Sequence, residues 1–520
     1  MPVRLGLVGS LPTMLVLGRL PGTTGKLPVL PGITPRSCRR VRTSPSCMKH
    51  LKQIPGSICA PRGFKCAAIF CDIKKLGTGK GSEKGRKNDL ALIVSDVPAA
   101  VAGMFTGNQV CAAPIRVSAK RAAGQSARAI VVNSGNANAC TGRQGILDAQ
   151  QMTRIAAAAV SSWHRHLADE AHGQDTRATT ERRNKVGQPS RLPRSDRKRD
   201  AYATIGVSEV LVCSTGRIGV PMPMGNVEQG IRRCAPLLAR SVSNARRVAK
   251  AIMTTDTCSK EIAVEFGIGN VKVRIGGVCK GAGMIQPGMK HATMLGFITS
   301  DVAIESNLLK RALNIAVDQS FNRITVDGDM STNDSVIALA NGLAENVKVE
   351  SSKSKAFEIF QSALNYVCLE LAKMIVRDGE GVSRFVTLHV RGARSARDAE
   401  SAARAIANSS LVRTSWCGGD PNWGRILCAL GYSDARVDEA MVDVGYAAPK
   451  SHKIVFAFRR GRPTNVALKT LAQVTSAPEF DLHVDLHLGG AEFTMYASDL
   501  TEKYVALNKG DVNDPTTLGG

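Results

Sequence analysis

A lysine, a glycine-rich turn and a threonine follow one another in the run Lys280-Gly-Ala-Gly-Met-Ile-Gln-Pro-Gly-Met-Lys-His-Ala292-Thr293. A threonine hydroxyl is a weak nucleophile, but a break in the preceding peptide bond gives Thr293 an α-amino group that can act as its base. That amine has a reference pKa of roughly 7.7–8.0, so it accepts and returns protons near neutral pH. Glycines permit the strained backbone that such a cut requires. On spacing alone, a glycine turn leading into a buried strand at residues 294–298 remains the simpler interpretation.

Acyl transfer through a hydroxyl also needs groups that stabilise negative charge on the carbonyl oxygen. Residues 210–216 read Val-Leu-Val-Cys-Ser-Thr-Gly, an apolar run that ends in a glycine-containing turn. Such a strand end can aim a hydroxyl and a backbone N–H at one point, so Ser214, Thr215 and Gly216 are candidates for an oxyanion site. An ordinary strand-ending turn explains the same residues, and both interpretations stay open.

An ordered series of polar and glycine-containing blocks runs from about Gly63 to about Asn508, with one long interruption. The blocks are residues 88–93, 102–108, 112–114, 133–138, 212–219, 253–257, 320–334, 378–381, 420–425 and 499–501. Together with residues 280–293, this series resembles the ornithine acetyltransferase family, also called bifunctional glutamate N-acetyltransferase of arginine biosynthesis. One block alone would be weak, but the ordered set is specific.

The resemblance implies an α/β fold of mixed α+β layers, the ornithine acetyltransferase-like fold, which cleaves itself into two chains. Cleavage would fall between Ala292 and Thr293. Residues 59–292 would then form an alpha chain and residues 293–520 a beta chain with Thr293 at its N-terminus. Two chains of each kind are expected to form a heterotetramer.

The implied activity moves an acetyl group from N-acetylornithine to glutamate by a ping-pong route. Thr293 carries the acetyl group after ornithine leaves, and glutamate then accepts it. Acetyl-CoA is a further potential donor. No cofactor is required, and no metal site is expected.

The resemblance also assigns individual site residues. They are catalytic Thr293, Thr215 and Gly216, and substrate-binding Thr254, Lys280, Thr293, Glu380 and Asn508. Thr255 is the alternative to Thr254, and the spacing to Lys280 favours Thr254. Taken singly, Lys280 could instead be a solvated lysine in a turn, and residues 378–381 an ordinary turn.

The chain departs from the family pattern at several places. Lys290 and His291 are two extra residues before the cleavage site, and Arg217 stands where the family has a bulky apolar residue. The tail from Lys509 onward does not match the family's C-terminus. These departures keep two alternatives open: an N-terminal-nucleophile aminopeptidase of related architecture, and an inactive scaffold.

The net charge of the 520-residue chain is +26, and it is unevenly distributed. No acidic residue precedes Asp72, and the early sequence is rich in Arg, Ser, Thr and Pro. This composition predicts a disordered transit peptide at residues 1–58, for a plastid first and a mitochondrion second. Residues 164–200 are charged and poor in apolar residues, which predicts a disordered insertion.

Composition also argues against several other classes of function. Aromatic residues make up 4% of the chain, so base-stacking surfaces are scarce and nucleic-acid binding is not expected. No apolar run reaches the roughly 18–20 residues of a membrane span. The 14 cysteines include no Cys-x-x-Cys pair with zinc spacing, which indicates reduced core cysteines.

Apolar periodicity predicts alternating strands and helices. Strands are expected at residues 90–94, 129–132 and 210–213, and helices at 148–161, 308–318, 355–376 and 396–408. The carboxylates and amides of residues 327–334 could hold a cation, but structural hydrogen bonding is the favoured interpretation. Residues 133–138 are interpreted as a structural loop, and Trp423 as a packing anchor.

Overall fold

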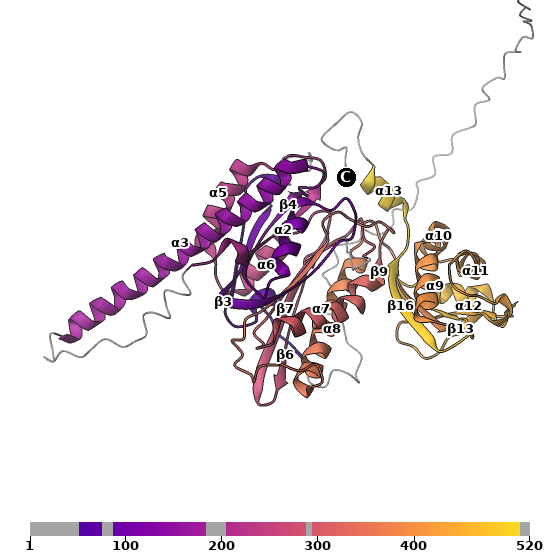
Figure 1. The fold of residues 1–520 in the computed structure, drawn as a ribbon. Coiled ribbons are helices and arrows are strands. Elements are labelled where there is room, and N and C mark those ends of the chain that lie inside the picture. The colour runs from indigo at the N-terminus through magenta and orange to yellow at the C-terminus, as the bar shows by residue number, and fades with distance from the viewer. Residues whose placement is uncertain (1–50, 75–86, 184–203, 288–293, 510–520) are drawn as a thin grey trace, which may run out of the picture. The chain divides into compact units, whose positions relative to one another are not determined.

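The computed structural model describes residues 51–74, 87–183, 204–287 and 294–509 (Figure 1). For residues 167–183 it describes the backbone alone. All of these residues belong to one compact unit, residues 41–520.

The first sheet has nine strands in the order β1-β6-β7-β8-β10-β3-β4-β5, and β2 also pairs with β3. Their bounds are β1 Lys52–Gln53, β2 Phe64–Ile69, β3 Leu90–Phe105, β4 Ser126–Asn136, β5 Val210–Arg217, β6 Lys260–Ile268, β7 Val271–Lys280, β8 Leu295–Ser300 and β10 Ser335–Ala340. The long strand β3 pairs with β4 and β10, and its register with β4 shifts between Val94 and Ala99. Strand β3 therefore belongs to both halves of the sheet.

The two halves of this sheet share an inner apolar core. Val278, Phe297 and Ile337 from one half pack in the same cluster as Ile130 and Leu211 from the other. Helices cover the outer faces (Figure 1). They are α2 Ala113–Ala122, α3 Gly142–Arg183 and α5 Met224–Cys234 on one half, and α7 Ser306–Asp318 and α8 Lys355–Arg377 on the other, while α6 Val242–Ala251 contacts β2. This arrangement confirms the predicted mixed α/β layers.

The second sheet has seven strands in the order β14-β13-β12-β15-β11-β16-β9. Its strands are β9 Ile324–Thr325, β11 Phe385–Ala393, β12 Asp443–Ala447, β13 Val455–Arg459, β14 Arg462–Pro463, β15 Glu479–Asp485 and β16 Ala491–Ser498. Its helices are α9 Ala396–Asn408, α10 Ser410–Gly418, α11 Trp423–Gly431 and α12 Leu468–Thr475. Trp423 stacks on Phe458 with ring centroids 4.9 Å apart, which is the packing role predicted for it.

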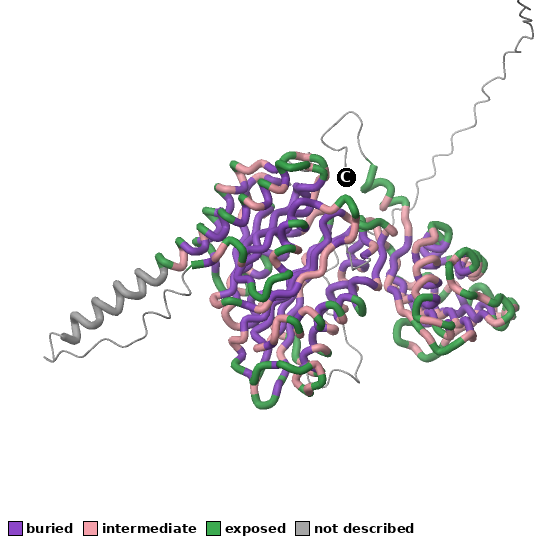
Figure 2. Tube along the Cα trace, in the orientation of Figure 1, coloured by how far each residue is buried: buried purple, intermediate pink, exposed green. Residues whose placement is uncertain are grey.

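Short helices complete the described elements. They are η1 Ser57–Cys59, η3 Val207–Glu209, η4 Ala235–Leu237, η5 Phe321–Arg323, η6 Glu439–Met441 and the C-terminal α13 Glu502–Asn508. The tube in Figure 2 shows the strands of the first sheet mostly buried, and α13 mostly exposed. The predicted strands and helices are all present, with longer bounds in most cases.

Among the described residues, α8 is the one helix long and apolar enough to cross a membrane. Leu364, Val367 and Leu371 on α8 are fully buried. A side chain added at Gly277 on β7 would approach Leu371 to 2.8 Å, so α8 lies directly against the sheet. The apolar side chains of α8 therefore pack in the protein core.

The predicted disordered insertion at residues 164–200 is wrong for its first half. Helix α3 continues through Arg183, and residues 184–203 lie outside the described residues. The early part of the segment contains Ala, Leu, Glu, Gln and Arg, which are good helix formers. A helix that is already under way also needs no new nucleus to continue. The charged composition of the segment suggested disorder, whereas the helix propensity of its residues favours the continued helix.

The predicted transit peptide also extends too far at its C-terminal end. Residues 1–50 lie outside the described residues, but β1 pairs with β6 and Ile58 is fully buried. The Ser57 hydroxyl donates to the carbonyl of Gly277 at 3.2 Å. A side chain at Gly276 would approach the Ser57 carbonyl oxygen to 1.9 Å, so this segment crosses β7 in direct contact. The lack of acidic residues before Asp72 suggested a transit peptide, but it carries no information about whether Ile58 is buried.

Removal of residues 1–59 should therefore destabilise the protein more than removal of residues 1–50. Burial of Ile58 alone is worth about 1.5–3 kcal/mol, so we expect a fall of at least about 2 kcal/mol in the free energy of unfolding. Urea denaturation of the two truncated proteins measures the difference. Equal stability would show that residues 51–59 do not contribute to the core.

Candidate active site

The predicted oxyanion residues lie at the end of β5, where two glycines make close contact. Gly216 has a φ of 132° and is the register partner of Gly135 on β4. A Cβ at Gly216 would lie 2.3 Å from the carbonyl carbon of Gly135, so no side chain fits there. Glycine thus allows the two strand ends to touch. Thr215 precedes this contact and is buried.

Buried amide side chains hold this strand end in place. The Ser214 hydroxyl donates to Asn133 Oδ1 at 2.6 Å, and Asn133 Nδ2 donates to the Asn136 carbonyl at 2.8 Å. Asn333 Nδ2 donates to the carbonyls of Ser214 at 2.8 Å and Ala137 at 2.6 Å. Satisfied buried networks of this kind are rigid. Residues 133–136 are the end of β4 and not a loop as predicted, but the segment does have the structural hydrogen-bonding role that was predicted for it.

Lys280 is the last residue of β7, and its Nζ lies 3.1 Å from Thr215 Oγ1. It is buried, so the alternative of a solvated turn lysine is wrong. An ammonium group only donates hydrogen bonds, so Thr215 Oγ1 accepts here and keeps its own hydrogen for another acceptor. Burial lowers the pKa of Lys280, and the carboxylate of Asp256 partly opposes that change.

A buried lysine between two aspartates lies next to this group. Lys260 Nζ is 2.6 Å from Asp256 Oδ1 and 2.5 Å from Asp378 Oδ2, and the lysine side chain is fully shielded from solvent. Asp378 also accepts from the backbone N–H of Thr257 at 3.1 Å. Asp256 accepts from the backbone N–H of Gly281 at 2.7 Å. The lysine therefore joins three separate segments of chain.

Asp256 and Lys260 are each held in their charged form. Burial alone would raise the pKa of Asp256, but the ammonium groups of Lys260 and Lys280 hold it well below its usual range. Burial alone would lower the pKa of Lys260, but the carboxylates of Asp256 and Asp378 hold it above its usual range. Sequence reasoning assigned no role to these three residues. The available signal was a lysine at the start of an otherwise mostly apolar strand.

The predicted substrate-binding residues Thr254, Glu380 and Asn508 lie around the same network. The backbone N–H of Thr254 donates to Asp256 Oδ2 at 3.0 Å. The backbone N–H of Glu380 donates to the Ala282 carbonyl at 2.8 Å. Asn508 Nδ2 donates to Glu380 Oε2 at 2.7 Å. The structure thus brings residues from four distant parts of the chain to the end of β7.

The glycine turn after Lys280 is fitted closely to its surroundings. A Cβ at Gly283 would lie 2.5 Å from the carboxyl group of Glu380. Asp327 accepts from the backbone N–H groups of Met284 at 2.5 Å and Ile285 at 2.8 Å. Burial raises the pKa of Asp327, and these backbone bonds oppose the rise. Asp327 thus has the hydrogen-bonding role that was favoured for it.

The predicted nucleophile and cleavage site cannot be placed in the same way. Lys290, His291, Ala292 and Thr293 lie outside the described residues. The chain is described again from Met294, whose carbonyl accepts from the Ser335 N–H at 2.8 Å. Leu295 is the register partner of Lys280 across the antiparallel strands β7 and β8. Strand β8 therefore begins beside the end of β7.

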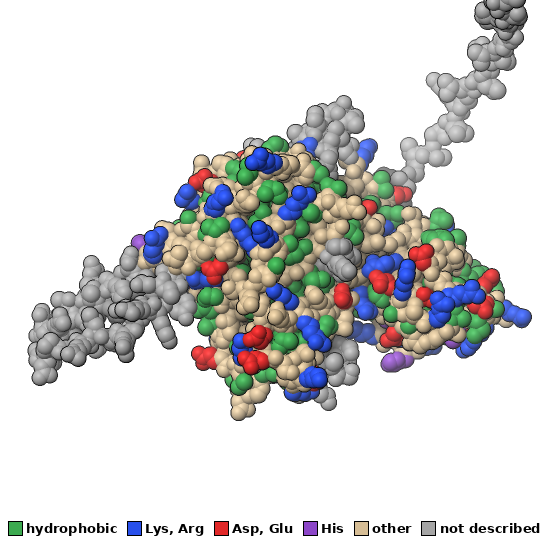
Figure 3. All heavy atoms as spheres, viewed as in Figure 1, with side chains coloured by type: hydrophobic (Ala, Val, Ile, Leu, Met, Phe, Trp, Pro, Cys, Tyr) green, Lys and Arg blue, Asp and Glu red, His purple; other side chains and the backbone are tan. Residues whose placement is uncertain are grey.

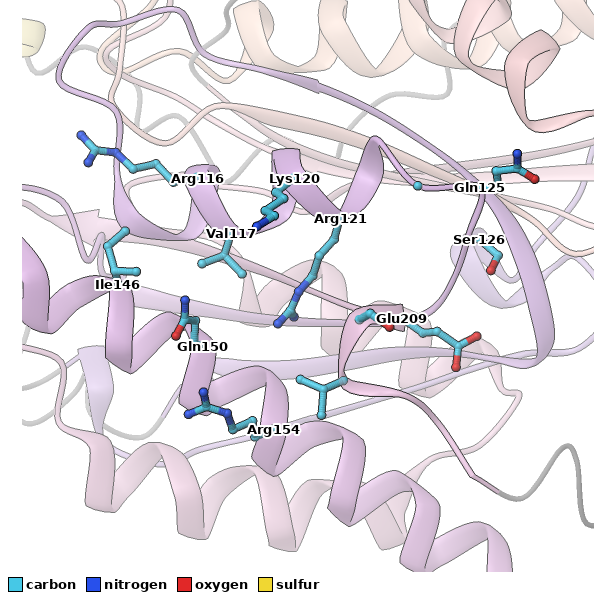
Figure 4. Close-up of a pocket in the computed structure, with 13 residues that line it drawn as sticks. Arg116, Val117, Lys120, Arg121, Gln125, Ser126, Ile146, Gln150, Arg154 and Glu209 are labelled. Carbon is cyan, nitrogen blue, oxygen red and sulfur yellow. The ribbon is translucent and has the colours of Figure 1, made fainter.

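A basic pocket of about 760 Å³ lies elsewhere, between α2, α3 and η3 (Figure 4). Its cationic lining residues are Arg116, Lys120, Arg121 and Arg154. Ser126 and Glu209 also line it; Ser126 begins β4 and Glu209 immediately precedes β5, whereas Thr215 lies near the end of β5. A strand of eight residues spans roughly 25 Å. This pocket is therefore separate from the cluster around Lys280.

A hydroxyl, a glycine N–H and a buried lysine at adjoining strand ends are groups that can stabilise negative charge on a carbonyl oxygen. That is the chemistry of acyl transfer. The chain belongs to the ArgJ family, whose sequence model matches residues 71–170 and 194–510. The match is interrupted within the predicted insertion.

Individual relatives match along most of their length. The arginine biosynthesis bifunctional protein ArgJ of Symbiobacterium thermophilum is 40% identical over 458 residues, covering 88% of this chain and 99% of that protein. The glutamate N-acetyltransferase of Methanocaldococcus jannaschii is 40% identical over 463 residues, covering 88% and 99%. A crystal structure of the ArgJ protein of Bacillus halodurans is 37% identical, covering 42% of this chain and 99% of that chain, with a TM-score of 0.39.

Replacement of the buried lysine tests the charge network. Lys260→Met should lower the free energy of unfolding by about 3–5 kcal/mol, because two buried carboxylates would lose their cation. Lys272→Met is the matched control, since Lys272 pairs with Glu265 at 3.4 Å but its side chain is 74% exposed. That change should cost less than about 1 kcal/mol. Urea denaturation measures both, and equal small losses would contradict the network's importance.

Proposed function

We propose that this chain transfers an acetyl group from N-acetylornithine to the α-amino group of glutamate through an acetyl ester on Thr293. The observation that carries the proposal is the meeting of Thr215, Lys280 and Glu380 at the end of β7, where β8 begins two residues after Thr293. Family membership and relatives named for arginine biosynthesis and glutamate N-acetylation support it.

Maturation creates the nucleophile. The Thr293 hydroxyl attacks the carbonyl carbon of Ala292, and the acyl group moves from nitrogen to oxygen. Water then hydrolyses the ester, which releases the carboxylate of Ala292 and a free α-amino group on Thr293. That amine is the base for the later steps, because its pKa lies near neutrality when it is free.

Transfer then proceeds in two balanced halves. The Thr293 oxygen attacks the acetyl carbonyl, and its proton passes to the α-amino group. The C–N bond breaks, and the proton goes to the departing amine of ornithine. The amine of glutamate attacks the resulting ester in the reverse sequence, which regenerates the hydroxyl and releases N-acetylglutamate.

Thr215 and Gly216 stabilise the negative oxygen of each tetrahedral intermediate. Lys280 donates to Thr215 Oγ1, so the Thr215 hydrogen is directed to the oxyanion, together with the N–H of Gly216. Glu380 offers a carboxylate to a substrate amino group, and Asn508 orients that carboxylate by donating to it at 2.7 Å.

The same proposal extends to assembly and location. Cleavage gives an alpha chain that ends at Ala292 and keeps the core residues 51–59, and a beta chain of residues 293–520. Two chains of each kind associate as a heterotetramer. The acid-free N-terminal sequence supports import into a plastid, with a mitochondrion as the second choice. Acetyl-CoA is proposed as a second donor to glutamate.

Small molecules suit this protein better than nucleic acid. On the face shown in Figure 3, Lys and Arg side chains are scattered and do not form one continuous stripe, and acidic side chains lie among them in places. A surface that follows a phosphate backbone would gather its cations along a track.

Two assays together test the function. Purified protein should yield a fragment that begins at Thr293, and it should convert N-acetylornithine and glutamate into ornithine and N-acetylglutamate. Thr293→Ala should abolish both, whereas Thr293→Ser should retain slow cleavage because it keeps a hydroxyl. N-terminal sequencing and mass spectrometry provide the readouts.

The alternatives give different results in the same experiment. An aminopeptidase would be cleaved but would hydrolyse an aminoacyl amide and transfer no acetyl group. A scaffold would remain one intact chain. A fragment with another N-terminal residue would falsify the assignment of Thr293. Replacing N-acetylornithine with acetyl-CoA tests the second donor separately.

The oxyanion role of Thr215 predicts a change in rate. Thr215→Val removes the hydroxyl while keeping the side-chain volume, and it should lower kcat by roughly 10²–10³. Thr215→Ser keeps the hydroxyl and is the control, with a much smaller loss expected. Steady-state kinetics on the cleaved enzyme measure both. If Thr215→Val turns over as fast as Thr215→Ser, the residue is only part of a turn.

A further inference from the structure

The second sheet has a polar face opposite the face that its helices cover. Along β11, Val386, Leu388 and Val390 are fully buried and belong to the core that the helices complete. Side chains alternate along a strand, so His389 points to the other face. Among the residues proposed for acetyl transfer, only Glu380 lies within ten residues of His389 in the sequence.

Three metal-ligating side chains meet on that face. His389 on β11 is the register partner of His483 on the parallel strand β15, and Asp481 lies two residues before His483 on the same face. One donor atom from each lies within 4.8 Å of the others. The two imidazole rings are stacked, with centroids 4.8 Å apart and an interplanar angle of 14°.

Neighbouring groups fix the orientation of two of these side chains. His389 Nδ1 lies 3.3 Å from the Thr494 hydroxyl, and His389 Nε2 lies 3.9 Å from Asp481 Oδ2. A proton on Nδ1 donated to Thr494 leaves the lone pair of Nε2 facing the carboxylate, as in many metal-bound histidines. The backbone N–H of Lys450 donates to Asp481 Oδ2 at 2.9 Å and holds that carboxylate in place.

The third side chain, His483, has a ring nitrogen without a hydrogen-bond partner among the described residues. That nitrogen, Nε2, is shielded from solvent. An imidazole nitrogen left unpaired in this way costs free energy, so such a group calls for an explanation. A bound cation would supply the missing partner.

We propose that His389, Asp481 and His483 bind a first-row divalent metal ion of the Zn²⁺ type, with water as the remaining ligand. Two imidazoles and one carboxylate suit Zn²⁺, whereas Mg²⁺ and Ca²⁺ prefer oxygen ligands alone. With metal–ligand distances of about 2.0–2.2 Å, each donor atom would move inward by less than about 1 Å. Rotation of the side chains achieves that movement without displacing the strands.

The ion would join β11 to β15, which are neighbours in the middle of the second sheet. A ligand that binds the folded state and not the unfolded chain stabilises the fold in proportion to its occupancy. The expected role is therefore structural, and the site operates whether or not acetyl transfer is correct.

The test uses the full-length protein, freed of metal with a chelator. Titration with Co²⁺ should give visible absorption bands that saturate at one equivalent, and Zn²⁺ should displace them. Zn²⁺ should also raise the unfolding temperature. His483→Gln and Asp481→Asn should each remove saturable binding and the thermal shift. Thr494→Val should weaken binding by roughly 10–100-fold through loss of the support to His389.

His487→Gln is the matched control. His487 also lies beside a carboxylate on this sheet, with Nε2 3.0 Å from Asp443 Oδ2, so it tests whether any histidine next to an acid gives the same signal. It should leave binding unchanged. The proposal is overturned if the parent protein shows no saturable Co²⁺ or Zn²⁺ binding at micromolar concentrations. It is also overturned if folded His483→Gln and Asp481→Asn, checked by circular dichroism, still bind.

Discussion

The arrangement of the candidate active site depends on one buried cation. Lys260 lies between Asp256 and Asp378, which are themselves buried, and its loss would remove the ion-pair partner that the two carboxylates share. The two aspartates in turn accept backbone N–H groups from the loop before β6 and from Gly281. The ion pairs therefore determine where the end of β7 lies relative to the end of α8. Lys280 and Glu380 are presented from those two ends.

Close backbone contact is the second constraint on the site. Gly216 lies against Gly135, and Gly283 against the carboxyl group of Glu380, with no room for a side chain at either glycine. The first contact brings Thr215 close to the end of β7, and the second brings the Glu380 carboxyl group close to the turn after Lys280. The hydrogen bond from Lys280 to Thr215 links the ends of β7 and β5, two strands that do not pair with each other. The missing side chains at these glycines allow the close approach, and the ion pairs of Lys260 stabilise the resulting arrangement.

The sequence predicts local elements well because their causes are local. The helix at residues 355–376 and the strand at 210–213 follow from apolar periodicity, and the positions of Thr215 and Lys280 follow from family motifs. The pairing of Lys260 with Asp378 joins residues 118 positions apart, and no local pattern encodes it. Burial of Ile58 and continuation of α3 were missed because charge composition says little about packing or helix propensity.

The C-terminal part of the chain contributes to the site through a set of partly buried hydrogen bonds. Asp499 Oδ1 accepts from the backbone N–H groups of Ser383 at 2.9 Å and Arg384 at 3.0 Å, just after the Glu380 turn. The Thr501 hydroxyl donates to the Gly381 carbonyl at 2.8 Å and also caps α13 by accepting from the Tyr504 N–H.

These bonds fix the start of α13 against the turn, so Asn508 at its end reaches Glu380. Arg413 on α10 completes the connection, because its guanidinium donates to the carbonyls of Val326 and Asp499. Val326 immediately precedes Asp327, which holds the glycine turn after Lys280. The second sheet therefore positions both sides of the Glu380 carboxylate without supplying a group to the oxyanion site.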